Sequence, residues 1–142
     1  MSSGPGKLLL VLASLTVVAV LAIALWVVGS PAAQRDARLD QRRTEDLQRV
    51  ERAVVAHWEA NGSLPADLAA LARVPGQSLP LNDPAGGPAY SYEPTGSRTF
   101  RLCASFVTDT ADDPRTRRGA NEDWLHAVGP KCFDRQIRDS QD

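Results

Sequence analysis

The chain begins with a long, uninterrupted apolar run. The 21 residues from Leu8 to Val28 carry no charge, and only two of them are polar. At about 1.5 Å per residue, such a helix spans roughly the 30 Å hydrocarbon core of a bilayer. Trp26 lies near one end and Lys7 precedes the other, and both residue types favour the membrane interface. We therefore predict one transmembrane helix over residues 8–28, with Val28 as its last residue, after an N-terminal tail of residues 1–7.

A cleavable signal peptide is the alternative interpretation of this run. The small residues of Ser30-Pro31-Ala32 would suit a cleavage site. The apolar region of a signal peptide, however, is usually about 7–15 residues long, and this one is longer. We therefore favour an uncleaved membrane span.

After a break at Gly29-Ser30-Pro31, the pattern changes to that of an amphipathic helix from Gln34 to Ala60. Six arginines and six acidic residues lie in this stretch, and we expect them on a solvated, ion-paired face. Asn61-Gly62 provides the C-cap, so residues 29–62 form a linker and a helix. The apolar positions recur at helical spacing and predict a packing stripe of Leu39, Leu47, Val50, Val54 and Trp58.

Residues 63–133 read as a small α+β domain. A short helix is expected over 65–73, followed by a loop rich in Pro and Gly. Alternating patterns then predict an antiparallel sheet from strands at 89–93 and 99–107 and an extended third segment at 124–133. The intervening residues 108–123 show no period. The polar residues 134–142 are expected to form a frayed tail.

Composition limits the class of protein. Sixteen basic residues against 17 acidic ones give a net charge of −1, and the arginines are interleaved with acids, which excludes a basic nucleic-acid-binding patch. The hydrophobic content of 43% falls to about 35% once the apolar run is set aside. The remaining chain can build only a thin core. We expect an α+β fold with a single N-terminal transmembrane helix, an amphipathic helix, a short helix and a small antiparallel sheet.

Cys103 and Cys132 are the only cysteines, and each has an apolar or aromatic neighbour in the sequence. In a small polar domain this suits a disulfide and an oxidising compartment. Closing a loop of about 29 residues would stabilise the fold by roughly 3–4 kcal/mol on the chain-entropy estimate. The pair therefore favours a domain outside the cytoplasm.

The charges around the apolar run favour the opposite orientation. Five arginines follow the run within the next 21 residues, whereas Lys7 and the amino terminus are the only positive groups before it. The positive-inside rule would keep the following domain in the cytoplasm. We give the cysteines more weight and predict a cytoplasmic N-terminus with the domain on the periplasmic side of a bacterial-type cytoplasmic (inner) membrane.

The order of these elements, with Asn61-Gly62-Ser63-Leu64-Pro65 and the segment from Asp83 to Tyr92, resembles the major pseudopilins of type II secretion and related type IV pilin-like proteins. In that family a helix runs into an "N-G-x-x-P" turn, and a "D-P-x-G-x-P-Y-x-Y" segment leads into the sheet. Ala89 shifts the Pro-Tyr pair by one residue here. The resemblance spans residues 8–106 and implies a pilin-like α+β fold. A cysteine pair near the C-terminus is also similar to a type IV pilin feature.

The N-terminus departs from that family. Pilin-like precursors have a Gly at the processing site, then an aromatic residue, and a Glu at the fifth mature position. Here Lys7 follows Gly6, and the fifth position after Gly6 is Val11. Without a Glu, no acidic group within the span could neutralise the amino terminus of a neighbouring subunit. We therefore expect a pilin-like domain that is not a standard filament subunit.

Few residues suggest catalysis. His57 is expected on the helix surface or core edge and His126 in a structural position, and no hydrolase, zinc or phosphate-loop motif occurs. A Cys103 nucleophile paired with His126 is an alternative, but a disulfide is favoured. The resemblance implies a calcium site in the C-terminal loop, where the candidate ligands are Asp109, Asp112 and Asp113. Their spacing matches no EF-hand and arginines interrupt them, so we expect a solvated loop and no bound metal.

These observations lead to a functional hypothesis. We expect a non-catalytic, single-pass, membrane-anchored accessory or scaffold subunit that contacts the lipid bilayer and other membrane, secretion or pilus proteins. We expect no cofactor, small-molecule substrate or nucleic acid. A true pseudopilin subunit of a type II secretion or type IV pilus system is the alternative. A small anchored enzyme or metal-binding module is the second.

Overall fold

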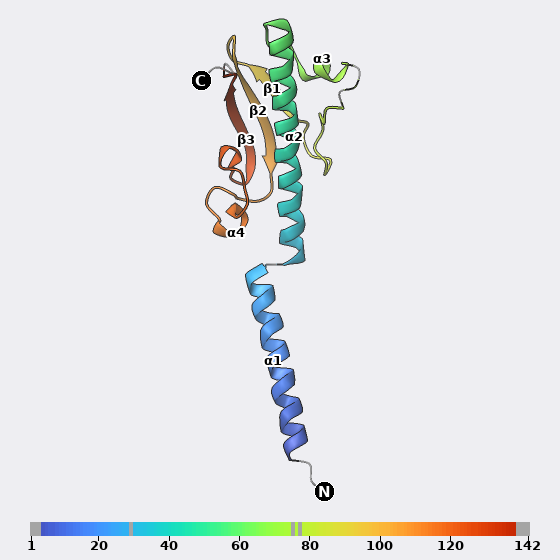
Figure 1. Cartoon of the computed structure of the whole chain (residues 1–142), viewed down its shortest axis with the longest axis vertical. Coiled ribbons are helices and arrows are strands. Elements are labelled where there is room, and N and C mark those ends of the chain that lie inside the picture. Colours follow the sequence, from blue (N-terminus) through green and yellow to red (C-terminus); the bar gives the residue numbers. More distant parts are fainter. Residues whose placement is uncertain (1–3, 29, 75, 77, 139–142) are drawn as a thin grey trace. The chain divides into compact units, whose positions relative to one another are not determined.

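The structure is a computed structural model that describes residues 4–28, 30–74, 76 and 78–138, apart from the side chains of Val28 and Arg115. The chain divides into two compact units, Met1–Arg35 and Asp36–Asp142. The order of elements is that of an α+β protein: two long helices, a short helix, and a three-stranded antiparallel sheet (Figure 1).

The first helix, α1 (Pro5–Val28), covers the predicted span and begins three residues before it. Pro5 occupies the first turn, where its missing N–H costs no hydrogen bond, and this explains the earlier start. None of its most apolar 18-residue window is buried in the structure. By length and composition, α1 is the one helix among the described residues that could cross a membrane, although a core helix or a signal sequence can pass the same test.

The second helix, α2 (Pro31–Asn61), is longer than the predicted 34–60. Ser30 caps its start by accepting a hydrogen bond from the Ala33 N–H at 3.2 Å. Gly62 ends it with a φ of +69°, and its N–H donates to the Trp58 carbonyl at 2.7 Å, as predicted for a C-cap. The helix α3 (Leu68–Ala72) follows, with Asp67 as its N-cap, so it is shorter than the expected 65–73.

The sheet contains β1 (Ser91–Pro94), β2 (Thr99–Phe106) and β3 (Gly129–Gln136), in that spatial order. Between β2 and β3 the chain forms a short helix, α4 (Pro114–Arg117), and a single 3₁₀ turn, η1 (Glu122–Trp124). The stretch 108–123, which shows no period in the sequence, therefore contains short helical elements that the hydrophobic pattern does not mark.

The end of the folded domain also differs from the expectation. The third strand begins later than predicted and continues to Gln136, and Ile137 is buried, although the polar tail was expected from residue 134. The reason is that the pairing with β2 continues through Thr99↔Gln136, and the Ile137 N–H then donates to the Arg98 carbonyl at 2.9 Å. In the sequence, the polar residues at the end of this strand cannot be distinguished from a polar tail.

The core forms between α2 and one face of the sheet. Leu47, Val50 and Val54 of the predicted packing stripe are completely buried, and Trp58 is half-buried at the edge of the core. Figure 1 shows α2 lying along the sheet. The sheet contributes the predicted inner face of β2 and one aromatic residue of β3: Phe100, Leu102, Ala104, Phe106 and Phe133.

Candidate functional site

The most distinctive feature of the domain is a buried cluster of charged side chains on the inner side of α2. Asp40 and Arg43 are separated by one helical turn, and only 2% and 5% of their surfaces are exposed. An Arg43 guanidinium nitrogen, Nη1, donates to Asp40 Oδ1 at 2.7 Å. The prediction that all charges of this helix lie on a solvated face is therefore wrong for these two residues.

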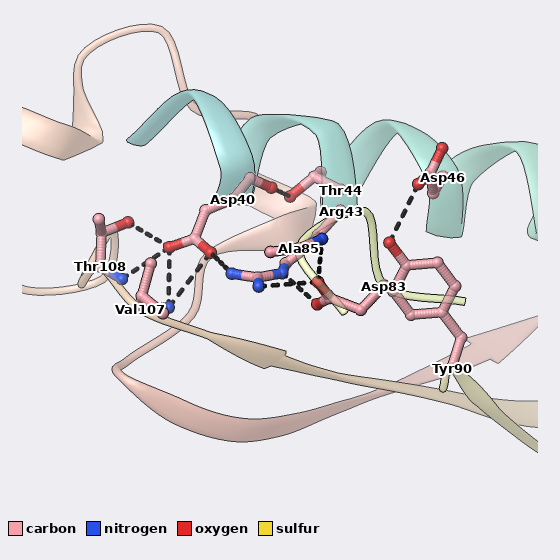
Figure 2. Close-up of polar contacts among 9 residues, drawn as sticks. All are labelled: Asp40, Arg43, Thr44, Asp46, Asp83, Ala85, Tyr90, Val107 and Thr108. Atoms are coloured by element: carbon pink, nitrogen blue, oxygen red, sulfur yellow. Dashed lines mark hydrogen bonds and ion pairs between the residues drawn. The ribbon is translucent and has the colours of Figure 1, made fainter. Parts of the chain in front are cut away.

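Asp40 binds the chain segment that leaves β2. Its carboxylate accepts hydrogen bonds from the backbone N–H groups of Val107 and Thr108, the latter at 2.6 Å, and from the Thr108 hydroxyl at 2.6 Å. Figure 2 shows these donors gathered around one carboxylate. Charge-assisted bonds of this kind are roughly twice as strong as neutral ones. Asp40 therefore fixes the end of β2 to the first half of α2.

Arg43 binds the loop between α3 and β1 through Asp83. Its Nε and Nη2 donate to Asp83 Oδ2 and Oδ1 at 2.5 and 3.0 Å, which is a two-pronged pairing (Figure 2). Asp83 also accepts from the Ala85 N–H at 2.7 Å, so its carboxylate shapes the Asp83-Pro84 turn as well. Gly87 passes close by, and a Cβ there would lie 3.2 Å from the Asp83 carboxyl carbon.

This pairing determines the charge states. The hydrogen bond from Arg43 holds the pKa of Asp83 below its ordinary value, and the same bond raises the pKa of Arg43 further above the physiological range. One turn along α2, Asp46 accepts a hydrogen bond from the Tyr90 hydroxyl at 3.0 Å. Burial raises the pKa of Tyr90, so it remains a neutral donor. The loop before β1 is thus joined to α2 at two points.

The cluster is chemically self-contained. The lone pairs of both buried carboxylates are directed at donors from the chain itself, and the Arg43 fork is occupied by the two carboxylates. Such an arrangement is suited to holding loops in place. It positions the segments before β1 and after β2 on a single helix.

His126 lies next to this cluster in a buried position. Its ring stacks on Phe106 with centroids 3.7 Å apart, and its Nδ1 has no hydrogen-bond partner among the described residues. Burial lowers the pKa of His126, and the nearby charge of Asp40 opposes that shift. Its backbone pairs with Thr110, whose N–H donates to the His126 carbonyl at 2.8 Å and whose hydroxyl accepts from the His126 N–H at 3.0 Å. These bonds close the neck of the loop between β2 and β3.

The predicted disulfide is present. Cys103 and Cys132 are directly opposite each other on β2 and β3 and are bonded, with their Cα atoms 4.0 Å apart. They lie on the sheet face that points away from α2. Cys103 is therefore no thiol nucleophile for His126, which is on the opposite side of the sheet. The pair joins two neighbouring strands that are already hydrogen-bonded.

The three candidate calcium ligands lie in the loop that follows β2. Asp109 Oδ1 accepts a hydrogen bond from the Asp112 N–H at 2.8 Å, and the Thr116 hydroxyl donates to the backbone carbonyls of Asp109 and Asp113. Nowhere in the described part of the chain do three or more His, Cys, Asp or Glu side chains come together in a group that could hold a metal ion.

The anchor residues named from the sequence lie on α1. Leu8 and Trp26 are 61% and 73% exposed, and Lys7 lies in the first turn of the helix. Val28 is the last helical residue, and its side chain is outside the described part of the structure. His57 lies half-buried on α2, near Asn61 at its C-terminal end.

The residues that sequence reasoning missed are Asp40 and Arg43. A usable signal exists, because the buried stripe extends backwards at spacings of four, three, four and three from Val54 through Val50, Leu47 and Arg43 to Asp40. Charged residues on the apolar side of a helix need buried partners. The partner Asp83 is 40 positions away and has no local signal beyond its Asp-Pro turn.

Searches for known relatives do not assign the protein to a group. We found no matching family model, no similar curated protein and no similar solved structure.

Proposed function

We propose that the protein is a membrane-anchored accessory subunit whose extracytoplasmic domain acts by binding other proteins. The observation that carries this proposal is the exposed apolar surface of α1. Its large apolar side chains from Leu8 to Val27 are 52–73% exposed, and the described residues of the chain bury none of its most apolar window. Such a surface needs a hydrocarbon environment. Only two residues separate α1 from α2, so the folded domain remains tethered at the bilayer.

The disulfide supports an extracytoplasmic location of the domain. A bonded cysteine pair persists in an oxidising compartment and is rare in the cytoplasm. The arginines after α1 favour the opposite side under the positive-inside rule. The three arginines nearest to the span, Arg35, Arg38 and Arg42, are all exposed on α2 and free to lie at lipid headgroups on either side.

The domain itself supports a binding role. Its buried charged cluster is occupied by its own chain, and its core is built from a helix and a small sheet. The pilin-like resemblance, in which a long helix packs on an antiparallel sheet, agrees with this architecture. We infer that the domain acts through contacts of its helix and sheet surfaces.

A topology experiment tests the anchoring and the orientation. Single cysteines are introduced at exposed positions on either side of the span, by Gly4→Cys or Glu59→Cys, and intact cells are treated with a membrane-impermeant maleimide. We expect labelling of the Glu59→Cys protein and protection of the Gly4→Cys protein until the cells are lysed. The reverse pattern would place the domain in the cytoplasm, and release of the protein by alkaline carbonate would exclude an integral anchor.

The second candidate, a working pilin-like filament subunit, rests on the same architecture. Val11 distinguishes the two functions, because a filament subunit would need an acidic group there. N-terminal sequencing and mass measurement of the membrane-extracted protein decide between them. A mature chain that starts at Lys7 with a methylated amine would favour the filament subunit, and an unprocessed N-terminus would favour the accessory subunit.

A further inference from the structure

The strand β3 forms one edge of the sheet. In the order β1-β2-β3 it pairs with β2 on one side, and no strand of the described residues lies on its other side (Figure 1). It is eight residues long, twice the length of the opposite edge strand β1. An edge of this length presents backbone donors and acceptors to any extended segment that reaches it.

The register identifies the backbone groups that point outward. The Ile137 N–H donates to the Arg98 carbonyl, so odd-numbered residues of this segment are bonded to the β2 side. The backbone groups of the alternate residues point away from β2, and these residues are Pro130, Cys132, Asp134 and Gln136. Two observations agree: Pro130 has no N–H to give to the ladder, and the 4.0 Å Cα separation at the disulfide suits a non-hydrogen-bonded pair.

These outward groups are open. Among the described residues, no backbone–backbone hydrogen bond outside the ladder engages Cys132, Asp134 or Gln136. Pro130 and Lys131 lie at the beginning of this edge, and two charged residues follow within it, the exposed Asp134 and the inward-facing Arg135, which pairs with Glu51 of α2. The five residues from Cys132 to Gln136 contain no proline and no bulge.

A stripe of alternating charge runs across the outer face to this edge. Glu93 of β1 is opposite Arg101 of β2, which is opposite Asp134 of β3. Arg101 Nε donates to Asp134 Oδ1 at 2.8 Å, and the Asp134 side chain remains 72% exposed. The order of charges is negative, positive, negative. A fourth strand continues the alternation only if it places a Lys or Arg opposite Asp134, since opposite charges on directly facing residues stabilise a sheet.

A second copy of the chain fits this edge poorly. Three central antiparallel registers of β3 with itself are possible, and each contains an unfavourable pair. Two of them place like charges opposite each other, Asp134 against Asp134 or Lys131 against Arg135. The third places Asp134 opposite Pro130, which has no N–H to donate. Pairing β3 with β1 of a second copy, so that the stripe continues, places Glu93 opposite Asp134. Like charges directly opposite each other are destabilising.

We propose that β3 is a docking edge for an extended segment of another protein, one that carries a Lys or Arg opposite Asp134 and uncharged residues on either side. The segment would add a fourth strand and form backbone hydrogen bonds with Cys132, Asp134 and Gln136. This proposal names the contact surface of the binding role inferred above and rests on it.

Two synthetic peptides test the proposal on the full chain in detergent micelles. One has the sequence Thr-Val-Thr-Arg-Thr-Val-Thr with blocked ends, and the other has Glu in place of Arg. Amide hydrogen exchange and NMR shifts of β3 are recorded during titration. We expect the Arg peptide to slow exchange at Cys132, Asp134 and Gln136, and to bind about two- to fivefold more tightly than the Glu peptide, which is the size of one cross-strand charge pair.

Variants of the edge make the test specific. Gln136→Pro removes one outward N–H and leaves the ladder to β2 intact, so it should weaken both peptides, while the matched control Gln136→Ala should leave binding unchanged. Asp134→Asn should abolish the difference between the peptides. Equal binding of both peptides to the native chain, or no slowed exchange at millimolar peptide, would overturn the proposal.

Two further results are distinguishable. Concentration-dependent protection of these amides without peptide would identify a second copy as the occupant and overturn the proposal. Failure of the peptides in a protein that passes the maleimide topology test would refute the docking edge alone. A failed topology test would instead refute the proposed membrane function.

Discussion

Removal of the Arg43 side chain is the sharpest test of the buried cluster. Arg43 provides three charge-assisted hydrogen bonds, one to Asp40 and two to Asp83. The Arg43→Ala change leaves two buried carboxylates without their common cation, a situation that typically costs about 3–5 kcal/mol. Asp40 keeps three donors from Val107 and Thr108, and Asp83 keeps the Ala85 N–H. We therefore expect a loss at the lower end of the range, about 3 kcal/mol at pH 7.

The loss should depend on pH in a defined direction. In the native protein the pKa of Asp83 is lowered, so its stabilising contribution is present above the ordinary carboxyl pKa of 3.8 and disappears as the pH falls through the folded value. Without Arg43, burial raises the pKa of the same group, so the variant gains stability relative to the native protein as the pH falls. The difference between the two proteins should therefore shrink from pH 7 to pH 4.5.

The assay is urea unfolding of the full chain in detergent, followed by the near-ultraviolet circular dichroism of the domain. Arg42→Ala is the matched control, because Arg42 is the adjacent residue and is exposed on the same helix; its effect should stay within about 0.5 kcal/mol. A double-mutant cycle with Asp83→Ala should give a coupling energy of about 2 kcal/mol. A loss below about 1 kcal/mol for Arg43→Ala, or a loss that does not change between pH 7 and pH 4.5, would refute the reasoning.

Three further predictions follow from the same structure. Replacement of Cys103 and Cys132 by Ser should lower the free energy of unfolding by about 3–4 kcal/mol, as expected for a sequence separation of 29. A reductant should cause the same loss in the native chain and leave the variant unchanged. Burial lowers the pKa of His126, so the contribution of the neutral ring to the free energy of unfolding should be fully present above the unfolded-state pKa near 6.5 and should decrease as the pH falls below it. His126→Phe should flatten this pH dependence in unfolding curves recorded between pH 7 and pH 5. An unchanged slope would contradict the assignment. Leu47→Ala should lower the free energy of unfolding by about 2–5 kcal/mol because it opens a cavity in the core, whereas Val74→Ala, at a 42% exposed position, should lower it little. Similar shifts of the two unfolding midpoints would contradict the assigned packing.

Most of the fold follows from local patterns. The apolar run, the stripe of Leu47, Val50 and Val54 and the alternation in β2 each have a period that specifies one element, so their type and buried side are predictable. Helix ends with strong caps, such as Gly62, are predictable for the same reason. The start of α1 is less so, because Pro5 extends it by a favourable first turn that the hydropathy pattern does not mark.

The parts that escaped prediction depend on long-range pairing. The last residues of β3, Asp134, Arg135 and Gln136, are all polar, and exposed positions alternate with a half-buried one. Only their pairing with β2 distinguishes them from a polar tail. The buried Asp40 and Arg43 look like ordinary surface charges, because helix propensity and composition treat them as such. Their burial is decided by Asp83 and by the end of β2, which are 40 or more positions away and reach α2 only in the folded chain.

The neck between Thr110 and His126 has a consequence for protein engineering. The hydrogen bonds between these two residues hold the ends of the connecting loop together, independently of the loop's interior. Trp124 packs against Phe133 and must stay, but none of the described side chains of residues 111–121, which exclude that of Arg115, belongs to the hydrophobic core. Lengthening a loop whose ends are already fixed costs little entropy, about 0.6 kcal/mol per doubling of its length. This segment is therefore the place where an epitope or a small reporter domain can be inserted without rebuilding the sheet.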